Sequence, residues 1–155
     1  AAPCMLNYSP AAKFVFAGDG ELRASLERRA QQLGIAHAVR FAGFQVNGGL
    51  VELYKACDVV CVPSRNEPFG IVLLEAWSAG KPVVSTRNGG PDEYVWHEVD
   101  GLKVEARPES IAWGLGTLFT NFEWARWMGR NGRYAAETAF SWDSIAQQTL
   151  QVYSA

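Results

Sequence analysis

The sequence has little excess charge and no long apolar run. Its 155 residues carry 14 Lys and Arg against 16 Asp and Glu, which gives a formal net charge of −2. Nucleic-acid binders usually show a strong basic excess, so this balance argues against that class. No apolar run approaches the ~20 residues that a transmembrane helix needs, and the first ten residues lack the n-region and h-region of a signal peptide. We therefore expect a cytoplasmic protein without a transmembrane segment.

The sequence is also poor in metal-ligating residues. The three cysteines, Cys4, Cys57 and Cys61, are an odd number without the spacing of a metal site. The only two histidines, His37 and His97, are too few for a typical three-ligand zinc site. We expect reduced thiols, surface histidines and no bound metal.

Short apolar runs alternate with helical patterns along the chain. We expect strands at 14–17, 39–41, 59–62, 83–85 and 101–104, and helices at 1–8, 21–33, 50–56, 70–79, 92–96, 109–119, 122–138 and 142–153. This alternation predicts an α/β fold, a Rossmann-like doubly wound parallel sheet sandwiched by helices, as a single domain over residues 1–155. The helix at 1–8 has no strand before it, so we expect the first strand of the sheet to be lacking.

The most informative stretch runs from Pro63 to Ser85. It reads as the end of a strand, a loop that contains Glu67, and a helix whose first turn carries no bulky polar residue. The amides of Gly70 and Ile71 are then free at the positive end of a helix dipole, where a phosphate is favoured. Glu67 and Glu75 flank this position, and carboxylates accept hydrogen bonds from pairs of sugar hydroxyls.

Glu67 and Glu75, with seven residues between them and Ala-Gly-Lys-Pro-Val-Val after them, resemble the E-x7-E motif of glycosyltransferase family four, the group 1 transferases. Shorter stretches also resemble this family: Ala17–Gly20, Val39–Gly43, Ala56–Val59, Asn88–Glu93 and Phe140–Asp143. The resemblance covers nearly all of the chain from about residue 11. It implies the C-terminal, donor-binding half of a GT-B fold in a retaining hexosyltransferase.

The resemblance also implies roles for individual residues. Glu67 should contact the transferred sugar and act in catalysis, and Glu75 should bind the ribose hydroxyls. The amides of Phe69, Gly70 and Ile71 should hold the sugar and the diphosphate.

A second group of donor-binding residues is expected after the first two strands. Gly18 should form a turn near the donor, and Phe44 and Gln45 should lie against the base. The implied substrate is a UDP-, GDP- or ADP-sugar, with no cofactor and no metal.

The chain departs from the family pattern at its start. The family's catalytic half normally opens with a strand and loop that supply an Arg and a Lys to the diphosphate, and nothing before Pro10 provides them. The N-terminal acceptor domain is not in the sequence either, so we expect it, or a partner chain that replaces it, to be required. The chain alone should be inactive, and the full-length enzyme could be cytoplasmic or peripheral to the membrane. The alternative is a non-catalytic module that binds a nucleotide sugar or another protein.

Two further interpretations are weaker. Gly18-Asp19-Gly20 after a strand could be part of a dinucleotide-binding fingerprint, but the third glycine is lacking. Residues 124–134 interleave arginines with aromatic residues, as in some single-strand binders. Without a wider basic surface, we interpret them as a helix with one core face and one solvated face.

Overall fold

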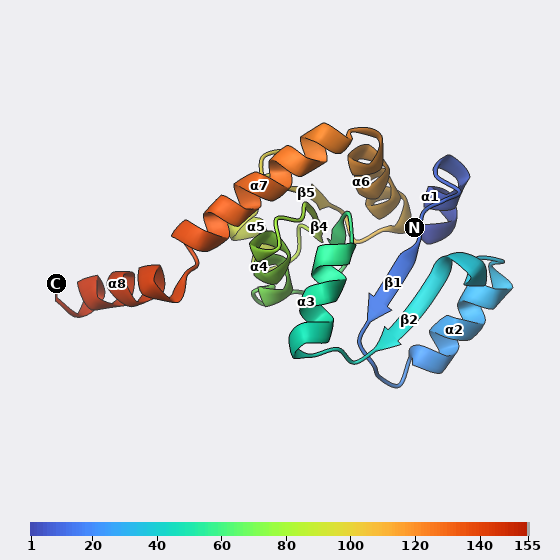
Figure 1. Ribbon diagram of the computed structural model, residues 1–155, viewed down its shortest axis with the longest axis horizontal. Coiled ribbons are helices and arrows are strands. Elements are labelled where there is room, and N and C mark those ends of the chain that lie inside the picture. The colour runs from blue at the N-terminus through green and yellow to red at the C-terminus, as the bar shows by residue number, and fades with distance from the viewer. Residues whose placement is uncertain (155) are drawn as a thin grey trace.

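The computed structural model describes residues 1–154, which form eight α-helices, one 3-10 helix and five strands (Figure 1). In chain order these are α1 (Ala2–Tyr8), β1 (Phe14–Ala17), α2 (Arg23–Gln32), η1 (Ala36–Ala38), β2 (Val39–Gly43), α3 (Asn47–Ala56), β3 (Val60–Val62), α4 (Ile71–Ser78), β4 (Val83–Thr86), α5 (Pro91–Tyr94), β5 (Gly101–Val104), α6 (Pro108–Thr120), α7 (Phe122–Thr138) and α8 (Trp142–Tyr153).

All strand pairs are parallel. Strand β4 is central, with Val83 opposite both Val60 of β3 and Gly101 of β5. Its four residues are all buried, as expected for a strand covered by helices on both faces. These pairings confirm the α/β class expected from the sequence.

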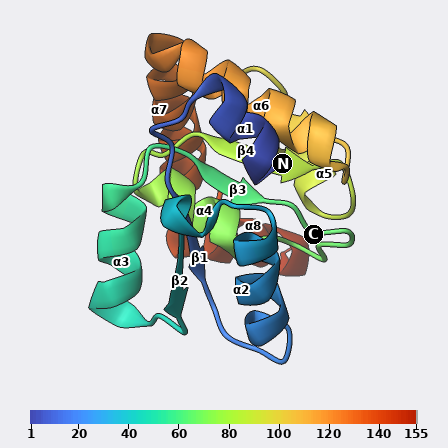
Figure 2. The same ribbon diagram turned by 90° about the vertical axis from the view of Figure 1, so that its right-hand side faces the viewer.

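Two apolar clusters cover the two faces of the β3–β4–β5 sheet. On one face, Met5 of α1 joins Val84 and residues of α6, and α1 lies against α6 (Figure 2). On the other face, Leu73 and Trp77 of α4 join Val83 and the second half of α7. The sheet is therefore the middle layer of a three-layer sandwich.

The parallel strands lie in two separate sheets rather than in one continuous sheet. Strands β1 and β2 pair with each other, and β3, β4 and β5 form a separate sheet. In a doubly wound sheet of order 3-2-1-4-5-6, the first strand lies between the second and the fourth. The order found here is β2–β1 and then β3–β4–β5, so the break falls at the position of that first strand. This agrees with the expectation that the first strand is lacking.

Helix α2 shows the consequence of the break. The sequence pattern predicts a buried face of Leu22, Leu26, Ala30 and Leu33, but only Ala30 is buried, and Leu22 and Leu26 are 69% and 47% exposed. A sheet of two strands is only about 10 Å wide, which is too narrow to cover a helix face.

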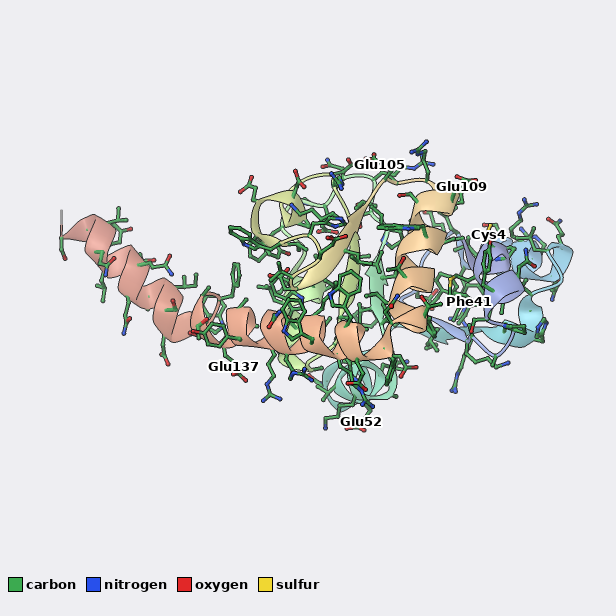
Figure 3. The ribbon with its side chains drawn as sticks, turned by 90° about the horizontal axis from the view of Figure 1, so that it is seen from above. Cys4, Phe41, Glu52, Glu105, Glu109 and Glu137 are labelled. Carbon is green, nitrogen blue, oxygen red and sulfur yellow. The ribbon has the colours of Figure 1, made fainter. Side chains whose placement is uncertain are left out.

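The C-terminal helix α8 projects from the body of the molecule (Figures 1 and 3), and none of its residues is buried. This helix begins at residue 142, as the sequence predicts. The Ser141 hydroxyl caps it by accepting a hydrogen bond from the Ser144 amide at 3.2 Å. Trp142 is 86% exposed.

Element bounds differ from expectation mainly at α3. That helix begins at Asn47, inside a stretch that the glycines suggested was a loop, and Asn47 itself takes a positive φ of 50°. Within residues 1–154, no helix is long and apolar enough to cross a membrane.

Candidate functional site

The loops that follow the parallel strands meet at one edge of each sheet. The loop after β3 carries Glu67, Phe69 and Gly70, and it leads into α4. The residues expected to bind the base, Phe44 and Gln45, follow β2. In open α/β sheets, ligands bind at this edge, next to the point where the strand order reverses.

The loop after β3 is braced by the loop after β4. The Glu67 amide donates to the Asn88 carbonyl at 3.1 Å, and the Gly90 amide donates to the Glu67 carbonyl at 2.8 Å. The Thr86 hydroxyl donates to the Ser64 carbonyl. A Cβ at Gly89 or Gly90 would collide with the backbone of residues 67–69, so the glycines allow this close approach. The loop that carries Glu67 is therefore held from both ends.

The start of α4 is open. Gly70 is its N-cap residue in the left-handed conformation, with φ 86°, and within residues 1–154 no side chain caps this helix. The Tyr94 hydroxyl donates to the carbonyls of Phe69 and Gly70, at 2.7 and 3.1 Å. The Leu73 amide donates to the Gly70 carbonyl at 2.9 Å, and within residues 1–154 the amides of Gly70, Ile71 and Val72 have no acceptor. Free amides and the helix dipole favour an anion at this position.

A glycine at the start of a phosphate-binding helix is expected to let the phosphate come close, because it has no Cβ, but the structure gives a different reason for Gly70. A Cβ there would lie 2.9 Å from the Tyr94 hydroxyl and 3.3 Å from Cγ of Glu67. The bare side of Gly70 thus faces the protein itself. Glycine is required for the left-handed turn and for this packing, not to make room for a phosphate.

Each of the two expected acids has one oxygen held by the protein. Oε2 of Glu67 accepts from the Ser64 hydroxyl at 3.0 Å, and Oε2 of Glu75 accepts from the Tyr54 hydroxyl at 2.8 Å. Both glutamates are half-buried, and no other group of residues 1–154 donates to either carboxylate. The second oxygen of each acid is available to a ligand.

Sequence reasoning missed both of these hydroxyl partners. Ser64 lies three residues before Glu67, so its place in the same loop could have suggested the contact. Tyr54 lies 21 residues before Glu75, on a different helix. No local pattern in the sequence connects Tyr54 to Glu75.

A cluster of aromatic rings packs around Tyr94, next to the start of α4. Tyr94 stacks against Phe69, Trp77 and Phe140, with ring centroids 5.5, 5.7 and 5.3 Å away. Burial, followed by the charge of Glu67, raises the pKa of the Tyr94 hydroxyl. That hydroxyl therefore stays protonated and donates to the two loop carbonyls.

The remaining expected residues gather on the β1–β2 side. The Gly18 amide donates to the Gly43 carbonyl at 2.8 Å, which places Gly18 beside the loop of Phe44 and Gln45. Phe44 is 75% exposed, and the Gln45 amide group donates to the Ala42 carbonyl at 2.6 Å. The structure thus brings Gly18, Phe44 and Gln45 together.

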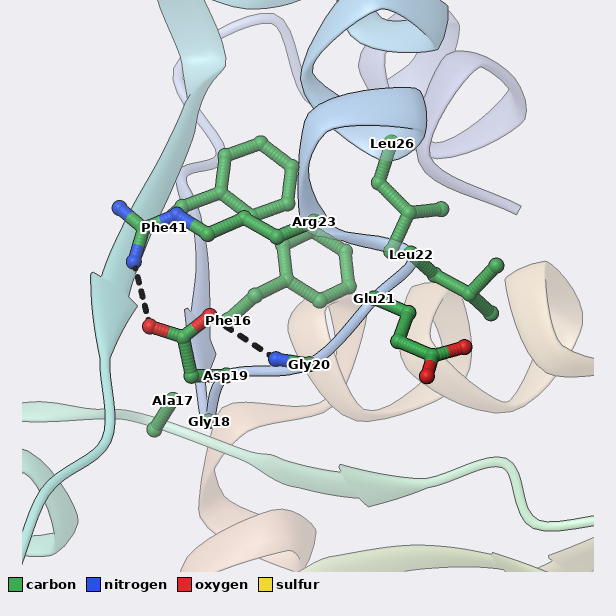
Figure 4. A pocket seen from close by; sticks show the side chains of 10 residues that line it. All are labelled: Phe16, Ala17, Gly18, Asp19, Gly20, Glu21, Leu22, Arg23, Leu26 and Phe41. Atoms are coloured by element: carbon green, nitrogen blue, oxygen red, sulfur yellow. Dashed lines mark hydrogen bonds and ion pairs between the residues drawn. The ribbon is translucent and has the colours of Figure 1, made fainter.

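A pocket next to Gly18 lies between α2 and the β1–β2 sheet (Figure 4). Its lining is mostly apolar, with Phe16 and Phe41 stacked at 5.3 Å, and an Asp19–Arg23 ion pair closes one side. Neither Glu67 nor Glu75 lines this pocket. We interpret it as the loosely covered face under α2. The residues expected to bind the donor lie in two groups, one on each side of the break in the sheet, and of these only Gly18 lines the pocket.

Comparisons with known proteins identify the family and the fold. The family model of the glycosyl transferases group 1 matches residues 5–134. An uncharacterized glycosyltransferase of Methanocaldococcus jannaschii is 44% identical over 143 residues, which cover 92% of this chain and 37% of the relative. The chain thus spans little more than a third of that protein's length.

Two solved structures are also similar. The crystal structure of Anabaena HepE in complex with UDP is 28% identical with a TM-score of 0.88, over 98% of this chain and 43% of that one; HepE has also been solved with UDP-glucose. The C-terminal domain of a group 1 glycosyl transferase, LpcC of Francisella tularensis, is 26% identical with a TM-score of 0.81, over 91% of this chain and 76% of that one. The chain therefore belongs to the glycosyl transferases group 1 family, and it has the fold of the C-terminal half of a GT-B protein.

Proposed function

We propose that this chain is the donor-binding domain of a retaining hexosyltransferase, which binds a nucleoside-diphosphate sugar. The observation that carries the proposal is the uncapped start of α4, flanked by two half-buried carboxylates that each keep one oxygen free. The UDP and UDP-glucose complexes of the similar HepE structure support the choice of ligand.

In this proposal the amides of Phe69, Gly70 and Ile71 hold the diphosphate and the sugar. Glu67 contacts the transferred sugar, and Glu75 binds the ribose. Gly18, Phe44 and Gln45 border the base. No metal or other cofactor takes part, because amides and the helix dipole supply the positive potential.

In the proposed reaction, the bond between the sugar's anomeric carbon and the diphosphate oxygen breaks, and a bond from that carbon to a hydroxyl oxygen of the acceptor forms. Negative charge develops on the departing diphosphate, which takes up the proton of the acceptor hydroxyl. Fixed donors aimed at that charge contribute strongly to catalysis. The α4 amides contribute part of this stabilisation. We infer that the paired cations come from the strand and loop that open the catalytic half in this family, and that the acceptor site comes from an N-terminal domain or a partner chain. These 155 residues alone should bind donor but transfer little.

The test is a calorimetric titration of the chain with UDP, GDP and ADP at millimolar protein concentration. We expect one nucleotide to bind, and we expect Glu75→Ala to weaken it by about tenfold, because hydrogen bonds to charged groups contribute about 1.5–3 kcal/mol. Glu67→Ala should leave the affinity for the diphosphate within about threefold and slow transfer in a full-length enzyme, since its partner is the sugar.

Glu123→Ala serves as the control, because the Glu123 side chain is 84% exposed in the first turn of α7. Absence of binding for all three nucleotides would overturn the proposed function. Equal losses of affinity in the Glu67 and Glu75 variants would contradict their separate roles. Binding without any transfer in the full-length protein would instead identify a non-catalytic module.

A further inference from the structure

Helix α3 meets helix α4 through one polar contact. Tyr54 lies near the end of α3, and its hydroxyl donates to Oε2 of Glu75, in the second turn of α4, at 2.8 Å. The Tyr54 ring packs against the apolar cluster formed by α4 and α7, so its position does not depend on this hydrogen bond alone. A rigid ring therefore presents a hydroxyl to the carboxylate.

In its contact with Glu75, the Tyr54 hydroxyl is the donor. Burial, followed by the hydrogen bond to Glu75, raises the pKa of Tyr54. The phenol thus stays protonated at any physiological pH. A carboxylate has about four lone-pair positions on two oxygens, and Tyr54 takes only one of them.

We propose that Tyr54 is a positioning residue for donor binding: it holds Oε2 of Glu75 and thereby turns Oε1 toward the ribose hydroxyls of the nucleotide. This inference rests on the proposed function, since it assigns the role of Glu75 to ribose. It names a residue outside the E-x7-E motif as a determinant of ribose recognition.

The physical reason is preorganisation. An unheld glutamate on a helix surface samples several rotamers, and ordering it on binding costs free energy. A carboxylate already held at one oxygen avoids that cost, and its free oxygen keeps one direction. The same fixed direction makes the acid sensitive to whether a hydroxyl is present on the ligand.

The experiment compares UDP with 2′-deoxy-UDP and 3′-deoxy-UDP, or with the matching analogues if GDP or ADP binds better. Dissociation constants are measured by calorimetry for the wild-type chain, Tyr54→Phe, Glu75→Gln and the double variant. The control is Tyr134→Phe, because Tyr134 is 71% exposed on α7 and makes no side-chain hydrogen bond to any of residues 1–154.

In the wild type, we expect loss of the recognised hydroxyl to weaken binding about tenfold. In Tyr54→Phe, the ratio of the dissociation constants of the deoxy analogue and the parent nucleotide should fall to about threefold or less, because an unheld carboxylate discriminates less. The effects of Tyr54→Phe and Glu75→Gln should not add, as expected of residues that act together. Tyr134→Phe should keep the wild-type ratio.

The ratio of two dissociation constants on one protein is insensitive to the fraction that is folded, so a destabilised variant still gives an answer. A Tyr54→Phe variant that binds all ligands more weakly by one common factor would overturn the inference and leave Tyr54 a purely structural link. A wild type that binds UDP and both deoxy analogues equally would also overturn the inference, because Glu75 would then not recognise the ribose hydroxyls. Failure of the wild type to bind any nucleotide would instead refute the proposed function on which it rests.

Discussion

Asp100 is the most deeply buried ionisable residue of the structure's described part, with 4% of its surface exposed. Its Oδ1 accepts from the Trp96 amide at 2.8 Å, and its carbonyl accepts from the Trp77 indole at 3.0 Å. Burial raises the pKa of its carboxyl from 3.8 to about 6, even though the Trp96 amide and Lys103 favour the charged form. Desolvation outweighs two backbone hydrogen bonds, from Trp96 and from Asp100 itself, and the charge of Lys103 at this site.

This shift predicts a pH dependence of stability. Between about pH 4 and pH 6 the folded protein keeps a proton that the unfolded chain has released, so the free energy of unfolding falls as the pH rises through that window. By pH 7 the loss is on the order of 2–3 kcal/mol. Asp100→Asn should abolish this loss of unfolding free energy. The variant should therefore be more stable than the wild type at pH 7, with little difference between the two at pH 4.

Thermal unfolding of both proteins at several pH values checks this expectation. Asp58→Asn is the matched control, because Asp58 is exposed. A difference between Asp100→Asn and the wild type that stays constant from pH 4 to pH 7 would show that Asp100 does not titrate as described.

At the scale of elements, the close crossing of α4 and α7 holds the donor-site helix in place. Gly129 and Gly132 lie on the buried face of α7, and a Cβ on Gly132 would collide with the indole ring of Trp77. A Cβ on Gly129 would collide with the Gly80 carbonyl, just beyond the end of α4. The two glycines let the helix backbones approach, while the arginines of α7 stay on its solvated face.

Gly132→Ala should therefore destabilise the protein despite the better helix propensity of alanine. We expect a loss of about 2 kcal/mol, because an added methyl group in a tightly packed region forces neighbouring side chains to move. Urea unfolding monitored by tryptophan fluorescence measures the change.

Gly116→Ala in α6 is the control for that substitution. Its Cβ would meet only the Met5 sulfur at an ordinary 3.6 Å, so alanine there should stabilise by about 0.5–1 kcal/mol. Equal effects of the two substitutions would mean that Trp77 moves aside without cost.

For the whole molecule, the break between the two sheets decides which parts of the site are preorganised. Glu67, Gly70 and Glu75 belong to the three-stranded part with its two packed faces, and Gly18, Phe44 and Gln45 belong to the two-stranded part with the loosely covered α2. A two-stranded ribbon is marginally stable by itself. We infer that an extended segment supplied by a longer chain or a partner would join β1 to β3 and bring both groups into one site.

Amide exchange measured residue by residue by NMR tests this inference. The Val60 amide donates to Pro82 beside β4, so alternation along the strand turns the Cys61 amide toward the open edge. By the same argument, the Gly18 amide bonds to β2 and the Ala17 amide faces away. In the 155-residue chain, Cys61 and Ala17 should exchange faster than Val60 and Gly18.

In a longer chain that includes the preceding strand, all four amides should exchange slowly. Unchanged fast exchange of Cys61 and Ala17 in that longer chain would contradict the placement of a strand between β1 and β3. Slow exchange of both amides in the present chain would show that these edges are already covered.

The sequence by itself determined the order and type of the elements, because most strands and helices are encoded by a local apolar pattern. Some boundaries are also marked by glycine, proline or a capping residue, such as Ser141 at the start of α8. It also determined the motif from Glu67 to Glu75, whose spacing places one acid before the helix and one within it. The predicted helix bounds lie within three residues of the observed ones. The start of α3 was predicted too late in the chain, because glycine-rich stretches favour loops.

Only the tertiary structure decided what depends on residues far apart in the chain. The break in the sheet follows from which strands pair, and a local pattern cannot report an absent neighbour. The link from Tyr54 to Glu75 joins two helices, the bare side of Gly70 faces Tyr94 from another helix, and the raised pKa of Asp100 comes from burial by surrounding elements. Each is a property of packing, because contact distances and desolvation exist only once the chain has folded.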